Sequence, residues 1–507
     1  MKTKLTPLSK FLIIVLILGG LAFLLYKTNL INVIAPKGEG KGISGDLKGE
    51  KVIRIGVVTW GGYSGGQLFN EGFGPSKESR FYKDYGFMVD FKLLDDFNDC
   101  RNAWKSDNID LMWATVDAFT TEVAGLKEYE PQIVFQSDWS RGGDAVVVTR
   151  TIKNVADLKG KKVAFAEMTP SHTFLLWLLE AGNLSYSDIN PVKVANAIDA
   201  ADLFKKGQVD AAVVWSPDDA DCVSKVTGAR VLQSTKEASY IISDVFVAKK
   251  KYVNENKDML VKLVEGWLKG AAEINTSETA KQKAAKILAA GLQQPEDFCL
   301  QAINNVRICT YGDNINFYNT KGTYTGITGE AIYNKMAVKY AKIGYPTDNI
   351  SSWRLVGNSS LISSLNLAGP GHEAENEVKF TSAGESAKTV EAISTKRVSI
   401  AFRSGSSEID ENAKYIIDNE FLDIAKSFGN ARIRIEGNTD NVGSEANNRA
   451  LSKRRAQAVV DYLVREHRFD ANRFVIVGNG PDKPVATNDT EEGKAKNRRT
   501  EFQLLSE

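Results

Sequence analysis

A serine in a glycine-rich loop is the first residue in this chain whose surroundings suggest covalent chemistry. The segment Gly62-Tyr63-Ser64-Gly65-Gly66 matches the Gly-x-Ser-x-Gly pattern of a hydrolase nucleophile and follows the apolar run Val52 to Trp60. A nucleophilic serine needs a histidine base, and His172 is the only histidine in this part of the chain. No oxyanion loop precedes the serine, so we expect the glycines to let a ligand approach and predict no enzyme activity.

A second segment, Thr169-Pro170-Ser171, has the residue types of a helix start that binds an anion. Thr169 is a favourable N-cap and Pro170 suits the first helical position, where free N–H groups attract negative charge. Tryptophans near Asp138 and Asp218 would instead suit a cationic or zwitterionic solute. The sequence therefore leaves the charge of a solute open.

The chain has few residues that could support metal or redox chemistry. The chain has three histidines and four cysteines, so we expect no metal site and no cofactor. In an oxidising compartment Cys100, Cys222, Cys299 and Cys309 could form up to two disulfides by three connectivities, with Cys299–Cys309 as the best local pair. Ordinary buried thiols are the alternative.

Length, composition and charge define the class of protein. The 507 residues predict about three folded units, and 43% apolar with 25% charged residues is typical of globular chains. A net charge of +1 offers no basic field for nucleic acid.

The N-terminus predicts a membrane anchor. Residues 11–26 carry no charge and follow three lysines, so we expect residues 1–10 to be a cytoplasmic stub and 11–30 a transmembrane signal anchor. Residues 31–51 are rich in glycine and predict a flexible linker. The bulk of the chain would then lie across that membrane from the N-terminus, attached to it by one span; a cleaved signal peptide is the alternative.

The elements that follow alternate between strands and helices. Apolar runs such as 162–166 and 211–214 alternate with amphipathic stretches such as 173–181 and 259–274. This alternation predicts an α/β architecture with largely parallel sheets, and about 300 residues favour two lobes.

Two segments of this unit, DLKGKKVA (157–164) and GQVDAAVVWSP (207–217), resemble ABC-transporter periplasmic solute-binding proteins of the nitrate, sulfonate and taurine branch. The resemblance implies that residues 52–356 form a two-lobed α/β solute-binding domain, with chain crossings near 142–148 and 243–248. It also implies a small-molecule solute and an ABC permease as partners. The cleft residues would be Trp60, Gly61, Ser64, Trp113, Thr115, Asp138, Ser140, Thr169, Ser171, His172, Trp215 and Asp218.

Residues 357–396 predict a linker, because they are rich in Ser, Gly, Ala, Glu and Lys. Residues 397–507 show alternating strands around two helical stretches, 411–428 and 445–466. This pattern predicts an α+β sandwich.

Four motifs in this last unit resemble the OmpA-like C-terminal domain, which binds peptidoglycan: EGNTDNVGS (436–444), NRALSKRRAQAVVDYL (448–463), GNGPDKPVATN (478–488) and EGKAKNRRTEF (492–502). The resemblance implies that Asp440 accepts from the ammonium of diaminopimelate in the peptide stem and that Arg455 holds its carboxylate. Asn448 matches the family's asparagine, and Thr439 and Asn441 would line the same loop. A mutual ion pair of Asp440 and Arg455 is the alternative.

Asn497, Arg498 and Arg499 match the closing NRR of the same family, and we expect them to be mainly structural.

The sequence therefore predicts a periplasmic solute-binding protein that is anchored in the inner membrane and tethered to peptidoglycan. Two alternatives stay open. One is a stator-like envelope protein, although the predicted span carries no carboxylate. The other is an interaction module whose solute-binding fold no longer serves transport.

Overall fold

The structure, a computed structural model, describes residues 49–345, 350–376, 378–400, 402–403 and 405–505. The predicted anchor at 11–30 lies outside these residues. Within them, no helix combines the length and the apolar character that a membrane crossing requires.

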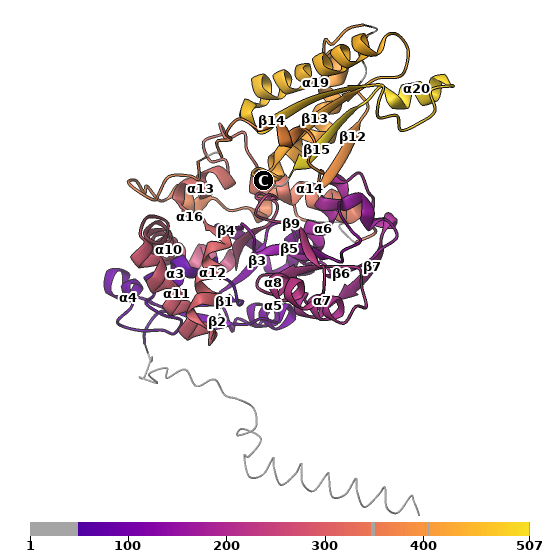
Figure 1. Ribbon diagram of the computed structural model, residues 1–507. Helices are drawn as coiled ribbons and strands as arrows, with labels where there is room; N and C mark the ends of the chain where they lie inside the picture. The colour runs from indigo at the N-terminus through magenta and orange to yellow at the C-terminus, as the bar shows by residue number, and fades with distance from the viewer. Residues whose placement is uncertain (1–48, 346–349, 377, 401, 404, 506–507) are drawn as a thin grey trace, which may run out of the picture. The chain divides into compact units, whose positions relative to one another are not determined.

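The first lobe is built on a six-stranded sheet in the order β11-β4-β10-β3-β1-β2 (Figure 1). Its strands are β1 (Val52–Val57), β2 (Met88–Leu93), β3 (Leu111–Thr115), β4 (Pro131–Ser140), β10 (Ser243–Lys249) and β11 (Val306–Ile308). Strand β1 runs parallel to β2 and β3, whereas β10 runs antiparallel to both β3 and β4. The expectation of largely parallel sheets was wrong here, because β4 leaves for the second lobe and β10 returns from it.

The second lobe carries a five-stranded sheet in the order β7-β6-β8-β5-β9. Its strands are β5 (Asp144–Val148), β6 (Lys162–Ala166), β7 (Asn190–Val194), β8 (Ala211–Trp215) and β9 (Arg230–Ser234). Strand β6 is parallel to β7 and β8, and β5 is antiparallel to β8 and β9. Both sheets are thus mixed.

Residues 141–143 and 235–242 connect the two sheets, adjoining the crossings that the sequence predicts. Thr235 holds the two connections together. Its hydroxyl lies 2.8 Å from the hydroxyl of Ser140 and accepts hydrogen bonds from the backbone N–H groups of Gly142 and Asp144, at 2.9 and 3.2 Å. Ile241 and Ile242 of the second connection are buried as well, so apolar packing joins these hydrogen bonds in the hinge.

Helices cover both sheets. Those of the first lobe and its C-terminal extension are α3 (Ser64–Phe69), α4 (Arg80–Tyr85), α5 (Phe97–Lys105), α9 (Lys250–Glu255), α10 (Lys257–Thr276), α11 (Glu278–Leu292), α12 (Glu296–Asn304), α13 (Tyr311–Phe317), α14 (Gly329–Lys342), α15 (Trp353–Val356) and α16 (Ser360–Ser363). Those of the second lobe are α6 (Pro170–Ala181), α7 (Ala197–Lys205) and α8 (Asp218–Lys225).

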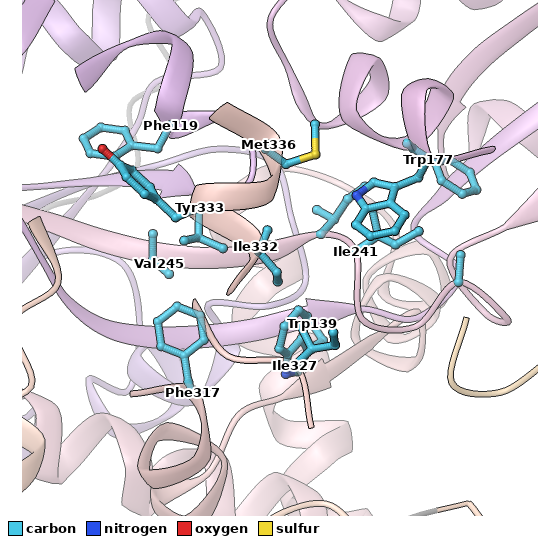
Figure 2. Close-up of a cluster of buried hydrophobic side chains, with 14 of the residues drawn as sticks. Phe119, Trp139, Trp177, Ile241, Val245, Phe317, Ile327, Ile332, Tyr333 and Met336 are labelled. Atoms are coloured by element: carbon cyan, nitrogen blue, oxygen red, sulfur yellow. The ribbon is translucent and has the colours of Figure 1, made fainter. Parts of the chain in front are cut away.

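Helix α14 joins side chains from both lobes in one apolar cluster. Its residues Ile332, Tyr333 and Met336 lie in the cluster shown in Figure 2. Phe119 of the first lobe and Trp177 of the second lobe belong to the same cluster. The helix therefore forms a third connection between the lobes.

Part of the predicted linker packs on the two-lobed module. Leu361 and Ile362 of α16 are fully buried, and the Thr310 hydroxyl donates to the carbonyl of Glu373 at 2.6 Å. Arg141 forms an ion pair of 2.6 Å with Glu375. The domain limits drawn from the sequence stay a prediction.

The C-terminal module has a four-stranded sheet in the order β12-β15-β13-β14, backed by the long helix α19 (Figure 1). Its elements are β12 (Ser394–Val398), α17 (Glu411–Ile417), the π-helical turn Asp418–Leu422, α18 (Asp423–Ser427), β13 (Arg432–Asn438), α19 (Glu445–His467), β14 (Phe474–Gly480), α20 (Glu491–Asn497) and β15 (Thr500–Leu505). Residues 411–427 are helical throughout, as predicted, and Phe421 stacks on Phe502 of the sheet with ring centroids 3.9 Å apart.

The four cysteines are all buried and all free, so neither of the possible disulfides is formed. Of the two interpretations left open by the sequence, the structure supports ordinary buried thiols.

Candidate functional site

A narrow cleft lies where the ends of strands from both lobes meet. It encloses about 20 Å³, room for roughly one water molecule. Its lining residues are Val58, Thr59, Trp60, Trp113, Thr115, Asp144, Pro170, Trp215, Ile242 and Asp244. In this conformation the cleft has no room for a larger molecule.

Four of the residues predicted from the sequence line this cleft: Trp60, Trp113, Thr115 and Trp215. Asp138 lies directly behind it, because its carboxylate accepts a 3.2 Å hydrogen bond from the indole N–H of Trp60. Ser140 lies at the hinge, where its hydroxyl donates to Asp144 at 2.8 Å.

The other predicted cleft residues have different surroundings. Gly61 packs against the backbone of α12 at Ala302, and the Ser64 hydroxyl donates to the carbonyl of Gly61 at 2.8 Å. The glycine loop thus serves close packing within the first lobe. Asp218 begins α8.

His172 lies inside an aromatic cluster. The ring centroid of Phe165 is 4.6 Å away and those of Tyr340 and Tyr345 are 5.1 and 5.3 Å away. Burial lowers the pKa of His172 to about 3. The imidazole is therefore neutral at physiological pH.

The start of helix α6 is closed by its own cap. The Thr169 hydroxyl accepts from the N–H of Ser171 at 3.2 Å, and the Thr169 carbonyl accepts from the N–H groups of His172 and Thr173 at 3.0 and 3.1 Å. Pro170 has no N–H group. The anion site that the sequence suggested here has its donors occupied.

Sequence reasoning missed Asp144 and Asp244, the two carboxylates that line the cleft. Each stands at the start of an apolar strand, in DAVVV and SDVFVA. A charged residue directly before a buried β-branched run is the signal that could have identified them, because such a side chain lies at a strand end without solvent.

Asp244 is held by Tyr63, whose hydroxyl donates to its carboxylate at 2.5 Å. Burial raises the pKa of Asp244 well above its ordinary value, and the nearby Asp138 raises it further. Burial also raises the pKa values of Asp138 and Asp144 to about 7. These carboxyls therefore bind protons at a pH where an exposed aspartate is ionised.

A second candidate site lies in the C-terminal module, in the loop between β13 and α19. Asp440 is 8% exposed, and its carboxylate accepts a 2.6 Å hydrogen bond from Arg498 and a 3.1 Å hydrogen bond from the N–H of Val442. The sequence left open a mutual ion pair of Asp440 and Arg455. In the described part of the chain, Asp440 pairs with Arg498 and not with Arg455.

Arg455 lies on α19, with its guanidinium 4.9 Å from the ring centroid of Phe402. Its Nε donates to the carbonyl of Ser406 at 3.0 Å and its Nη2 to that of Arg403 at 3.4 Å. Burial lowers the pKa of Arg455, and the nearby carboxylate of Asp440 opposes that change. No hydrogen bond between described residues uses Nη1, which leaves that group able to bind a ligand.

Three further predicted residues lie in this loop or contact it. Asn448 donates to the carbonyl of Val442 at 3.0 Å, and Thr439 donates through its hydroxyl to the carbonyl of Asp440 at 2.8 Å. Asn441 is exposed. Asn448 therefore positions the loop rather than standing in it.

The closing NRR segment has divided roles. Asn497 accepts from the N–H groups of Val485 and Ala486 at 2.8 and 3.0 Å, and Arg499 pairs with Glu501 at 2.8 Å. These contacts hold the fold together, as expected for a structural role. Arg498 differs, because it pairs with the candidate site residue Asp440.

Among the described residues, no group of three His, Cys, Asp or Glu side chains is arranged to hold a metal ion.

Comparison with known proteins gives a separate match for each module. Residues 77–277 match the family described as NMT1/THI5 like, and residues 401–498 match the OmpA family.

Several curated relatives match part of the chain, and two of them show the extent of the match. They are outer membrane porin F of Pseudomonas aeruginosa, 40% identical over 111 residues, and the peptidoglycan-binding protein ArfA of Mycobacterium tuberculosis, 46% identical over 90 residues. The alignments cover 22% and 18% of this chain and only 31% and 27% of those relatives.

Among solved structures, the periplasmic aliphatic sulphonate binding protein SsuA from Escherichia coli aligns with 60% of this chain and 98% of its own chain. It is 19% identical, with a TM-score of 0.45. From the two family matches, this chain joins an NMT1/THI5-like domain to a C-terminal domain of the OmpA family, as the sequence motifs predicted.

Proposed function

We propose that this protein binds a small solute in its two-lobed module and peptidoglycan in its C-terminal module. The observation that carries the proposal is the pair of candidate sites. The first is an aromatic cleft between two hinged lobes, and the second is a loop in which Asp440 and Arg455 present opposite charges.

Peptidoglycan binding has a direct chemical rationale. A diaminopimelate residue presents an ammonium and carboxylates together, so a carboxylate and a guanidinium on one surface complement it. The OmpA-family match and the similarity to the peptidoglycan-binding protein ArfA support this assignment.

We further propose that residues 11–30 anchor the chain in the inner membrane and that the bound solute passes to an ABC-type permease. The linkage to the wall would then keep the binding module near the membrane. Full-length protein should remain with membranes through a high-salt wash and retain its N-terminal sequence. A mature chain that starts near residue 30 to 40 would exclude the anchor.

A second candidate function is protein interaction without a solute. The observation that favours it is the small size of the cleft, about 20 Å³. Thermal unfolding of the full chain should separate the two functions, because a solute at 100 times its Kd adds about 2.7 kcal/mol to stability. A screen of sulfonates, nitrate, zwitterions and organic amines that leaves Tm unchanged would favour protein interaction.

A further inference from the structure

Four buried aspartates lie at the cleft or close to its residues in the chain, and none of them forms an ion pair with a described residue. Asp117, Asp138, Asp144 and Asp244 are each at most 5% exposed. A buried carboxylate is costly unless it is paired or protonated, so this group of acids needs an explanation.

The strand register makes the arrangement more costly. On the antiparallel strands β4 and β10, Asp138 stands directly opposite Asp244, and Asp244 stands opposite Thr115 on β3. Like charges in directly opposite positions destabilise a sheet. Proteins retain such local conflicts mainly at functional sites.

The cationic side chains near the cleft are already used. Arg101 donates two hydrogen bonds to Glu122, at 2.6 and 2.8 Å, and Arg141 pairs with Glu375. His172 is neutral and the first turn of α6 is capped by Thr169. The structure therefore offers an anionic solute no free positive group in this part of the described chain.

Unpartnered polar groups point to a ligand at the same place. The Thr115 hydroxyl lines the cleft, is 97% buried and has no hydrogen-bond partner among the described residues. Both carboxylate oxygens of Asp117, two residues further on, are also buried and unpartnered. The hydroxyls of Thr115 and Thr173 are nevertheless close enough to the Asp117 carboxylate to oppose the rise of its pKa. The indole N–H groups of Trp113 and Trp215, which line the cleft, are also buried without a partner among the described residues.

The aromatic lining suits an organic cation. Trp60, Trp113 and Trp215 line the cleft beside Asp144 and Asp244, and tryptophan faces attract ammonium and guanidinium groups. A metal ion fits less well, because no three acidic, histidine or cysteine side chains of the described residues are arranged to coordinate one.

We propose that the cleft selects a small organic cation, an ammonium or guanidinium group, which Asp144 and Asp244 bind while the tryptophans enclose its apolar part. This inference rests on the proposed solute-binding function and narrows it. It differs from the anionic solute named for the SsuA structure, a periplasmic aliphatic sulphonate binding protein.

Isothermal titration calorimetry on the full chain at pH 8 tests the inference. The probes are the cations butylammonium, choline and methylguanidinium, against the anions 1-butanesulfonate, 2-hydroxyethanesulfonate and nitrate. At least one cation should bind ten times more tightly than any of the anions. Asp244→Asn and Asp144→Asn should each weaken that binding by about tenfold or more, because each leaves the buried cation without a paired charge. Both amides keep the size of the side chain.

Asp258→Asn is the matched control, since Asp258 is an exposed aspartate of the same module. It should bind like the unchanged protein, and circular dichroism should show all three variants folded. Binding of 1-butanesulfonate without binding of any cation overturns the inference and leaves the proposed function intact. Binding of none of the six probes overturns the inference and counts against solute binding itself. An equal loss of cation binding in Asp258→Asn would also overturn the inference.

Discussion

The guanidinium of Arg498 donates a 2.6 Å hydrogen bond to the carboxylate of Asp440. One oxygen of Asp440 is thereby fixed by Arg498, and the other accepts from the backbone N–H of Val442 at 3.1 Å. A carboxylate held on both oxygens has one orientation, which is what recognition of a ligand ammonium requires. Arg498 is therefore a positioning residue for the proposed peptidoglycan site.

Arg498→Ala should weaken binding to diaminopimelate-type peptidoglycan by about two- to fivefold. The Arg498 side chain is 42% exposed, so the pair contributes on the order of 1 kcal/mol or less. Sedimentation of the full chain with purified peptidoglycan measures the change. Unchanged or tighter binding would show that Arg498 does not orient Asp440 and would support competition between Arg498 and the ligand.

Asp440→Ala and Arg455→Ala should have larger effects in the same assay. Each removes one partner of a desolvated charged contact, which costs about 2–5 kcal/mol, or roughly 30-fold or more in affinity. Arg454→Ala is the matched control, because Arg454 is the next residue of the same helix and is exposed. If both site variants bind normally while folded, the OmpA-like module has another ligand.

The stability of the solute-free protein should fall as the pH rises from about 5 to 8. Burial raises the pKa values of Asp117, Asp138 and Asp144 from 3.8 to about 7. These groups bind protons more tightly in the folded than in the unfolded chain. Their contribution is therefore full below about pH 4 and is lost as the pH passes through 7.

Urea unfolding at several pH values measures this loss, which should reach several kcal/mol because each pKa unit corresponds to about 1.4 kcal/mol. Asp144→Asn should flatten the pH profile and Asp258→Asn should leave it unchanged. A profile that is flat in the unchanged protein would contradict protonation of the buried acids.

Gly62→Ala should destabilise the first lobe by about 1–3 kcal/mol. A Cβ at position 62 would lie 1.8 Å from a carboxylate oxygen of Asp138, so the aspartate and the indole of Trp60 that donates to it must both move. Gly74→Ala is the control, because a Cβ there meets no atom within 4 Å. Equal values of Tm for the two variants would exclude this tight contact.

The four cysteines should react with iodoacetamide only after the protein has been unfolded. This reaction should need no reductant, because no disulfide has to be opened first. Burial raises the pKa values of Cys222 and Cys299 to about 11 and that of Cys309 well above its ordinary value. Since the thiolate is the reactive form, native protein should resist iodoacetamide. Mass spectrometry should find four adducts in urea, whereas fewer than four would reveal a disulfide.

The sequence by itself determined the two kinds of module and the loop that presents Asp440. The EGNTDNVGS and NRALSKRRAQAVVDYL motifs place Asp440 at the end of a strand and Arg455 on the helix that follows. Local signals decide such a strand–loop–helix unit, because the turn residues, the N-cap Ser444 and the apolar face of α19 are all close together in the chain. Trp60, Trp113 and Trp215 were found in the same way, at the ends of apolar strands.

Only the tertiary structure decided the charge of the cleft and the partner of Asp440. Asp138 and Asp244 are 106 positions apart in the numbering, and they face each other only because β4 and β10 pair in a particular register. Arg498 reaches Asp440 across 58 positions. Sequence patterns report which residues lie on a strand or helix, whereas the pairing of distant strands depends on packing of the whole sheet. The antiparallel direction of β4 and β10 also depends on the pairing of distant strands. The alternation of strands and helices in the sequence did not indicate it.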